Sequence, residues 1–189
     1  MAPEPAGKPS ILLLALVVEL GLGAIALAVG GFPGQRGPLG LLPSAALGAV
    51  AAAPPLLAVY AMGRSPRPAF RELLRISRNF VRDYLSPISL PAIVLLSVAA
   101  GLGEELLFRG LIQRVLSERL GLAAALVATS AVFALLHAVT RAYAFYAFLL
   151  SLYLGVLFAA TGNIAVPIVT HAVYDAVLLY VLDRDERST

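Results

Sequence analysis

Six long apolar segments constrain the fold of this chain more than any other feature of its sequence. Each is close to the ~20 residues that a helix needs to cross the hydrocarbon core of a membrane. They cover about Ser10–Gly30, Leu39–Met62, a run that starts near Ile88, Leu122–Ala138, Tyr143–Ala160 and Ile164–Leu182. Only 13% of the residues are charged, whereas soluble domains contain about 25%. The sequence therefore predicts an all-α, polytopic membrane helix bundle of about six transmembrane helices.

The polar segment Gly63–Pro87 predicts one further helix, which lies along the membrane surface. From Arg67 onward, apolar residues recur at three- and four-residue steps, and arginines occupy another face. The arginines on that face are Arg71, Arg75, Arg78 and Arg82. Helices with this pattern bind anionic lipid headgroups, and positively charged loops stay on the cytoplasmic side. We therefore expect membrane lipids as partners of this helix, and both chain termini inside the cell.

These patterns divide the chain into three regions. Residues 1–87 contain the first two spans and the interfacial helix, residues 88–182 form a helical core with the motifs described below, and residues 183–189 form a charged tail. Met1–Ser10 is polar and Gly31–Pro38 predicts a turn. The apolar run after Ser10 is longer than the core of a signal peptide, so we interpret it as an uncleaved span. The net charge of +3 arises mainly from the interfacial segment and does not indicate a nucleic-acid partner.

Three charged residues interrupt the third apolar run, within the segment Gly103–Gly110. An ionised side chain at the centre of a membrane helix raises the free energy of insertion by at least ~2.5 to 3.5 kcal/mol. We therefore expect these residues to pair with other groups or to have a functional role. Glu105 precedes Arg109 by four residues, which is the favourable order for an ion pair on a helix. Glu104 projects about 100° away from Glu105 and lacks that partner. We therefore predict a supporting Glu105–Arg109 pair and a Glu104 carboxyl group that is available for chemistry.

Both histidines of the chain also lie in apolar segments. His137 lies near the end of span four, and His171 lies one helical turn before Asp175 in span six. Because ionisable residues in membrane spans face a bundle interior or a wet cavity, we expect Glu104, His137, His171 and Asp175 to converge. The expected span ends place Glu104 about 24 Å from the start of span three at Ile88. They place His137 near the cytoplasmic end of span four, at a different depth. Convergence therefore requires a bent acidic helix or different span ends.

The composition excludes cysteine chemistry, because the chain contains no cysteine. Its intramembrane serines lack a nucleophile turn, and we expect them to act as packing residues. The serines considered are Ser97, Ser130 and Ser151. A carboxylate with an imidazole can instead activate water as general base and then protonate a leaving amine. A second imidazole can stabilise the oxyanion of the tetrahedral intermediate, so hydrolysis without a covalent intermediate is the favoured chemistry.

A zinc ion that carries the water is the alternative. Its ligands would be Glu104, His137 and His171, gathered from three spans. The HExxH helix signature is absent from the sequence. The preferred hypothesis therefore needs no cofactor, and zinc stays open as the alternative.

The order of the motifs resembles that of the CPBP family of CAAX prenyl endopeptidases and bacteriocin-processing proteins, also called the abortive-infection family of intramembrane proteases. The resemblance covers about residues 90–182. Its three motifs are Glu104-Glu105-x-x-x-Arg109, Phe133-x-x-x-His137 and His171-x-x-x-Asp175.

The resemblance implies an all-helical intramembrane glutamic protease. By analogy, Glu104 and His137 activate water, and His171 forms the oxyanion site together with position 175. Glu105 and Arg109 support this site. The members that cut prenylated proteins carry asparagine where this chain has Asp175, and an ionised aspartate would repel an oxyanion. The resemblance therefore leaves Asp175 with two roles, as a protonated donor or as a group that orients His171.

The preferred function is an endopeptidase of a plasma membrane, prokaryotic by resemblance, with its active site towards the cytoplasm. Its substrate would be a peptide or a membrane-protein segment, with or without a lipid anchor. A non-catalytic membrane scaffold that regulates a partner protein is the alternative from another class. A proton-relay transporter is disfavoured, because the broken helix pairs of inverted repeats are missing. Glu19, inside span one, is expected to be protonated or paired across the bundle, with support of the site as its functional alternative.

Overall fold

The computed structural model describes residues 8–31, 33, 37 and 39–188, and the regular structure in this part of the chain is helical throughout. Most of Met1–Ser10 and most of the predicted turn Gly31–Pro38 lie outside the described residues. The helices are α1 (Lys8–Gly30), α2 (Leu41–Ala51), α3 (Ala53–Arg64), α4 (Pro68–Phe80), η1 (Val81–Leu85), α5 (Leu90–Glu105), η2 (Leu106–Gln113), α6 (Arg114–Leu120), α7 (Leu122–Leu136), α8 (Arg141–Thr161) and α9 (Ala165–Ser188). The segments η1 and η2 are π-helical.

Five helical stretches of the described chain are long and apolar enough to cross a membrane. They are Ile11–Gly30, Leu41–Arg64, Leu90–Leu120, Arg141–Thr161 and Ala165–Arg187. The prediction of an all-α membrane bundle is therefore confirmed, but the count of about six full spans is not. The expected fourth span is the shorter helix α7, whose 15 residues extend about 22 Å. The third stretch continues through α6 and ends before Gly121, which has a φ of +80°.

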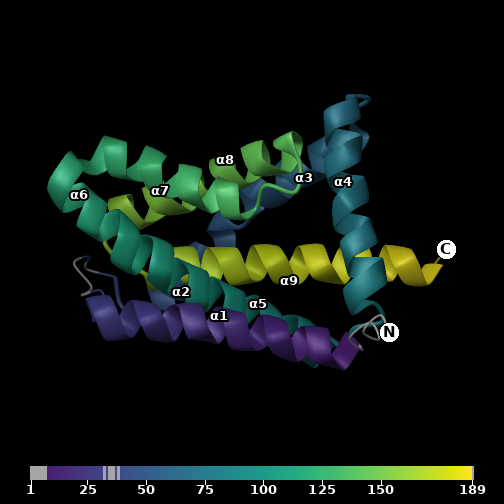
Figure 1. Ribbon diagram of the computed structural model, residues 1–189, viewed down its shortest axis with the longest axis horizontal. Helices are drawn as coiled ribbons and strands as arrows, with labels where there is room; N and C mark the ends of the chain where they lie inside the picture. The colour runs from purple at the N-terminus through teal and green to yellow at the C-terminus, as the bar shows by residue number, and fades with distance from the viewer. Residues whose placement is uncertain (1–7, 32, 34–36, 38, 189) are drawn as a thin grey trace, which may run out of the picture.

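The helices run back and forth between two ends of the molecule (Figure 1). Helix α4 lies across one end, where α9 also terminates, whereas α6 lies at the opposite end. Large apolar side chains cover the outer surface, including Leu42 at 82% exposure and Leu135 at 75%. An aqueous protein rarely exposes so much contiguous apolar surface, so a lipid environment accounts for it.

Two glycines bring neighbouring helices close to the turn of α5 that carries the acidic motif. A Cβ atom on Gly103 would overlap with the backbone carbonyl of Glu19 in α1. A Cβ atom on Gly101 would lie 2.8 Å from the carbonyl oxygen of Ile168 in α9. Because these glycines lack side chains, α1 and α9 pack directly against α5, and their polar residues reach its acidic turn.

Helix α4 is the helix that we predict from Arg67 onward, and it is amphipathic. Leu73 and Leu74 are buried against Met62 of α3. The four arginines of the predicted polar face are exposed, three of them in α4, at positions 71, 75 and 78, and one in η1, at position 82. Its position in the membrane interface stays a prediction.

Candidate active site

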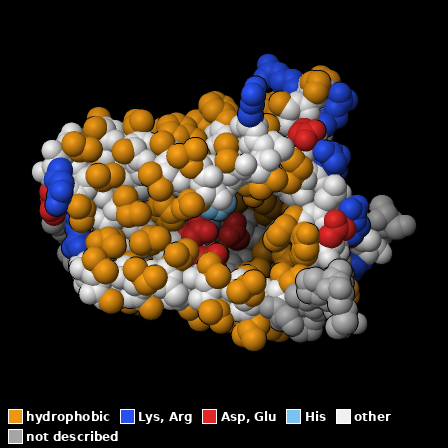
Figure 2. Space-filling view, viewed as in Figure 1, with side chains coloured by type: hydrophobic (Ala, Val, Ile, Leu, Met, Phe, Trp, Pro, Cys, Tyr) orange, Lys and Arg blue, Asp and Glu red, His pale blue; other side chains and the backbone are white. Residues whose placement is uncertain are grey.

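A polar cavity of 160 Å³ lies between α5, α7, α8 and α9. Among the residues that line it are Glu104, His137, His171 and Asp175. Figure 2 shows acidic and histidine side chains at the bottom of a hollow in the middle of one face, surrounded by hydrophobic side chains. The four residues expected to converge therefore do so, from three segments that are far apart in the sequence.

Glu104 lies between the two imidazole rings. Its Oε1 atom is 3.8 Å from His137 Nε2, and its Oε2 atom is 3.8 Å from His171 Nε2. Both distances exceed those of a direct hydrogen bond, and a water molecule can bridge polar groups at such separations. Glu104 Oε2 is buried and has no hydrogen-bond partner among the described residues. The Glu104 carboxyl group is thus directed at both imidazoles without being bonded to either.

The position of His137 depends on the early end of α7. The residue caps the helix with φ −102° and ψ 14°, immediately after Leu136. Its Nδ1 atom is 2.9 Å from the carbonyl oxygen of Phe133, and the two rings stack at 4.2 Å. Because a carbonyl oxygen only accepts, Nδ1 carries a proton and donates it to Phe133, and Nε2 faces Glu104. The expected end of this span, at about Ala138, lies two residues beyond the last residue of α7.

Glu105 and Arg109 form the predicted ion pair, and both side chains are fully buried. Arg109 donates through Nη1 to Glu105 Oε1 at 3.1 Å, and its Nε lies 3.1 Å from Oε2. Its Nη2 donates to the backbone oxygen of Ser151 at 2.6 Å and to Ser151 Oγ at 3.0 Å. The paired Glu105 also accepts from His171 Nδ1, at 2.8 Å. A rigid network therefore fixes the orientation of the His171 ring.

Asp175 lies on the open side of His171. Its Oδ2 atom is 3.4 Å from His171 Nε2, and its side chain is 27% exposed, against 6% for His171. Both ring nitrogens of His171 thus face carboxylate oxygens, Nδ1 towards Glu105 and Nε2 towards Glu104 and Asp175. The ring is therefore placed to donate hydrogen bonds.

The described residues contain no group of three or more histidine, aspartate and glutamate side chains arranged to hold a metal ion. The zinc alternative with Glu104, His137 and His171 as ligands thus gains no support from the geometry. The arrangement does fit water activation by a carboxylate and an imidazole, with a second imidazole as donor.

Sequence reasoning missed two contributions to the site. Tyr143, Tyr146 and Tyr174 also line the cavity, and Ser151, expected to be a packing residue, holds Arg109. The spacing of Tyr143 and Tyr146 by three residues places them on one helix face, which is a weak signal. Nothing in the sequence pairs Ser151 with Arg109, because 42 residues separate them.

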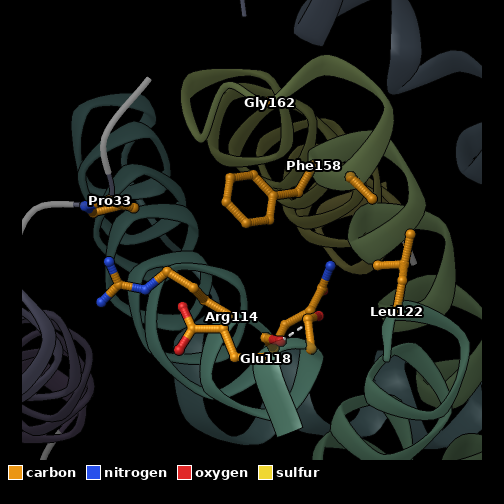
Figure 3. Close-up of a pocket in the computed structure, with 9 residues that line it drawn as sticks. Pro33, Arg114, Glu118, Leu122, Phe158 and Gly162 are labelled. Carbon is orange, nitrogen blue, oxygen red and sulfur yellow. Dashed lines mark hydrogen bonds between the residues drawn. The ribbon is translucent and has the colours of Figure 1, made fainter. Parts of the chain in front are cut away.

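A second cavity, of 420 Å³, lies at the corner between α6 and α7. Arg114, Glu118 and Phe158 are among its lining residues (Figure 3). It shares no lining residue with the histidine cavity. The larger cavity therefore lacks both imidazoles, and the smaller one is the candidate active site.

Comparison with known proteins identifies one family. The family model described as "Type II CAAX prenyl endopeptidase Rce1-like" matches residues 86–177. The matched region includes Glu104, Glu105, Arg109, both histidines and Asp175. No curated protein and no solved structure matches the chain.

Proposed function

Because residues 86–177 belong to the Rce1-like family of type II CAAX prenyl endopeptidases, we propose that this chain is an intramembrane endopeptidase in which Glu104 activates water. The observation that carries the proposal is the position of Glu104, 3.8 Å from an Nε2 atom of each histidine inside a polar cavity. Purified protein in liposomes should cut membrane-inserted peptides, with fragments identified by mass spectrometry. Failure to cut any peptide of a diverse library would contradict the proposal.

The reaction proceeds by addition of water to the scissile carbonyl. A water molecule between Glu104 and His137 gives a proton to the Glu104 carboxylate, and its oxygen forms a bond to the carbonyl carbon. The oxyanion that results accepts a hydrogen bond from the His171 imidazolium. Glu104 then transfers its proton to the amide nitrogen, and the C–N bond breaks to leave a carboxylic acid and an amine. Asp175 orients His171 in this scheme and does not contact the oxyanion.

An apolar groove next to the cavity supports an amphiphilic substrate. It has a volume of 450 Å³ and lies between α3, α4 and α8. Tyr146 and Leu150 line both the groove and the catalytic cavity. We propose that an apolar segment of the peptide, or a lipid anchor attached to it, enters through this groove while the scissile bond reaches Glu104.

Chelation tests the zinc alternative directly. We expect proteolysis to continue at the wild-type rate, within about twofold, after dialysis against EDTA or 1,10-phenanthroline, because Glu104 and His137 suffice to activate water. Elemental analysis of the purified protein checks the same point without an assay. Loss of activity that added zinc restores would instead favour the metal-dependent mechanism.

We propose that α4 lies on the cytoplasmic side, with its exposed arginines against anionic lipid headgroups. The ion pairs that these arginines make, such as Arg75 with Glu72, are exposed and therefore weak, so headgroups can compete for them.

The absence of cysteine from the chain makes this topology easy to test. The Arg71→Cys variant is expressed in bacterial cells. Its cysteine should react with a membrane-impermeant maleimide in inverted vesicles but not in intact cells. Arg119→Cys, in α6 at the opposite end of the bundle (Figure 1), is the matched control and should show the reverse. Labelling of position 71 in intact cells would overturn the orientation.

A further inference from the structure

Acidic groups outnumber basic ones in and around the candidate active site. Three carboxyl groups belong to it, those of Glu104, Glu105 and Asp175, and a fourth, that of Glu19, lies outside the cavity lining but within electrostatic range; the bases are Arg109, His137 and His171. Four acids minus three bases leave one carboxyl group uncompensated, even if both imidazoles are protonated. In an apolar environment this group must hold a proton or bind a cation from outside.

Glu19 adds the extra acid from outside the family-matched region. Its backbone touches Gly103, and its Oε2 atom is buried without a hydrogen-bond partner among the described residues. It lies within electrostatic range of Glu104, His171 and Asp175. Part of the negative charge near the site therefore comes from α1, which lies outside the three motifs.

Asp175 is the most exposed of the three carboxyl groups contributed by the motifs. Its side chain is 27% exposed, against 11% for Glu104 and 0% for Glu105. Tyr143, Tyr146 and Tyr174 are among the residues that line the same cavity. Tyr146 donates a hydrogen bond from its hydroxyl to that of Tyr174 at 2.9 Å, which links α8 to α9 across the cavity.

Aromatic rings next to a carboxylate are the chemistry that recognises an organic cation. The ring faces attract an ammonium or guanidinium group, more strongly when it is desolvated, and the carboxylate supplies the opposite charge. A neutral side chain of equal length would gain neither contribution. The cavity is therefore complementary to the positively charged end of a side chain and also holds the catalytic Glu104.

We propose that this cavity selects substrates with a lysine side chain next to the scissile bond, bound between the tyrosines and Asp175. The inference rests on the proposed proteolytic function and names the substrate class of the same site. The lysine charge compensates the surplus carboxylate, and its position beside His171 brings the adjoining carbonyl to Glu104.

The test compares matched peptides in a membrane. A library carries lysine, arginine or norleucine, the uncharged analogue of lysine, at each position flanking the cleavage site. We expect kcat/KM for the best lysine peptide to exceed that of its norleucine partner by about tenfold or more. Asp175→Asn and Tyr146→Leu should each reduce this ratio towards one, whereas Asp175→Glu should retain most of it. Glu118→Gln, an exposed acid outside the cavity, is the control and should leave the ratio unchanged.

The ratio separates the two hypotheses. Equal cleavage of lysine and norleucine peptides by the wild type overturns the lysine preference and leaves the proteolytic function intact. If no peptide is cut, the proteolytic function fails and the inference falls with it. Asp175 also contacts His171, so Asp175→Asn can change catalysis as well as substrate binding. The affinities of the lysine and norleucine peptides for Glu104→Gln protein are therefore measured in parallel. Equal affinities also overturn the lysine preference.

Discussion

Glu104→Gln protein should lose peptide-bond hydrolysis by about 10²- to 10⁴-fold, which is the range for removal of a general acid–base group. Glutamine has nearly the same shape as glutamate but cannot take a proton from water. The bundle should stay folded, because Glu104 lies 3.8 Å from each imidazole and is hydrogen-bonded to neither. Single-turnover cleavage of a membrane-inserted peptide measures the rate, and circular dichroism with a thermal melt checks the fold.

The matched control is Glu118→Gln. Glu118 belongs to the same continuous helical stretch, Leu90–Leu120, but is exposed and lines a different cavity. This variant should keep wild-type activity. Equal activity of Glu104→Gln and wild type would remove Glu104 from the mechanism. A cellular phenotype that persists in Glu104→Gln cells would favour the alternative of a non-catalytic scaffold.

Local spacing sufficed to predict the parts of the site that lie on one helix. Glu105 and Arg109 are four residues apart and form their pair, and His171 and Asp175 show the same relation. Charged side chains in a membrane span are costly unless they face partners or a cavity, so these residues are expected to converge with Glu104 and His137. Helix periodicity and burial cost therefore predict which of these acids and histidines lie together, but not the tyrosines or Ser151.

The parts that could not be predicted depend on contacts between helices. The π-helical segment η2 begins directly after Glu105, and such segments are frequent at functional sites but have no simple sequence signature. The early end of α7, which places His137 beside Glu104, lies within an apolar run that continues to Val139. Hydropathy cannot locate that end, because the residues on both sides of it are apolar. Ser151 likewise becomes important only through its contact with Arg109.

Arg109→Ala should be the most destabilising single change in the site. Removal of one partner of a buried ion pair typically costs about 3–5 kcal/mol, because the other charge stays buried and uncompensated. Arg109 is fully buried, and its loss also leaves the Ser151 backbone oxygen without this donor. The free energy of unfolding, measured by titration with SDS in mixed micelles, should fall by about this amount. Arg119→Ala, an exposed arginine six residues beyond Gln113 in the same helical stretch, should change it by less than about 0.5 kcal/mol.

A double variant separates the structural role of this pair from its catalytic one. Glu105→Leu combined with Arg109→Met removes both charges, and replacement of a buried pair by apolar residues is often neutral or stabilising. We therefore expect the double variant to recover most of the stability that Arg109→Ala loses. Its activity should stay low, because Glu105 also holds His171 Nδ1 at 2.8 Å and leucine cannot orient the ring. Wild-type stability of Arg109→Ala would show that the pair contributes nothing to the bundle. Full activity of the double variant would show that His171 does not need Glu105 to stabilise the oxyanion.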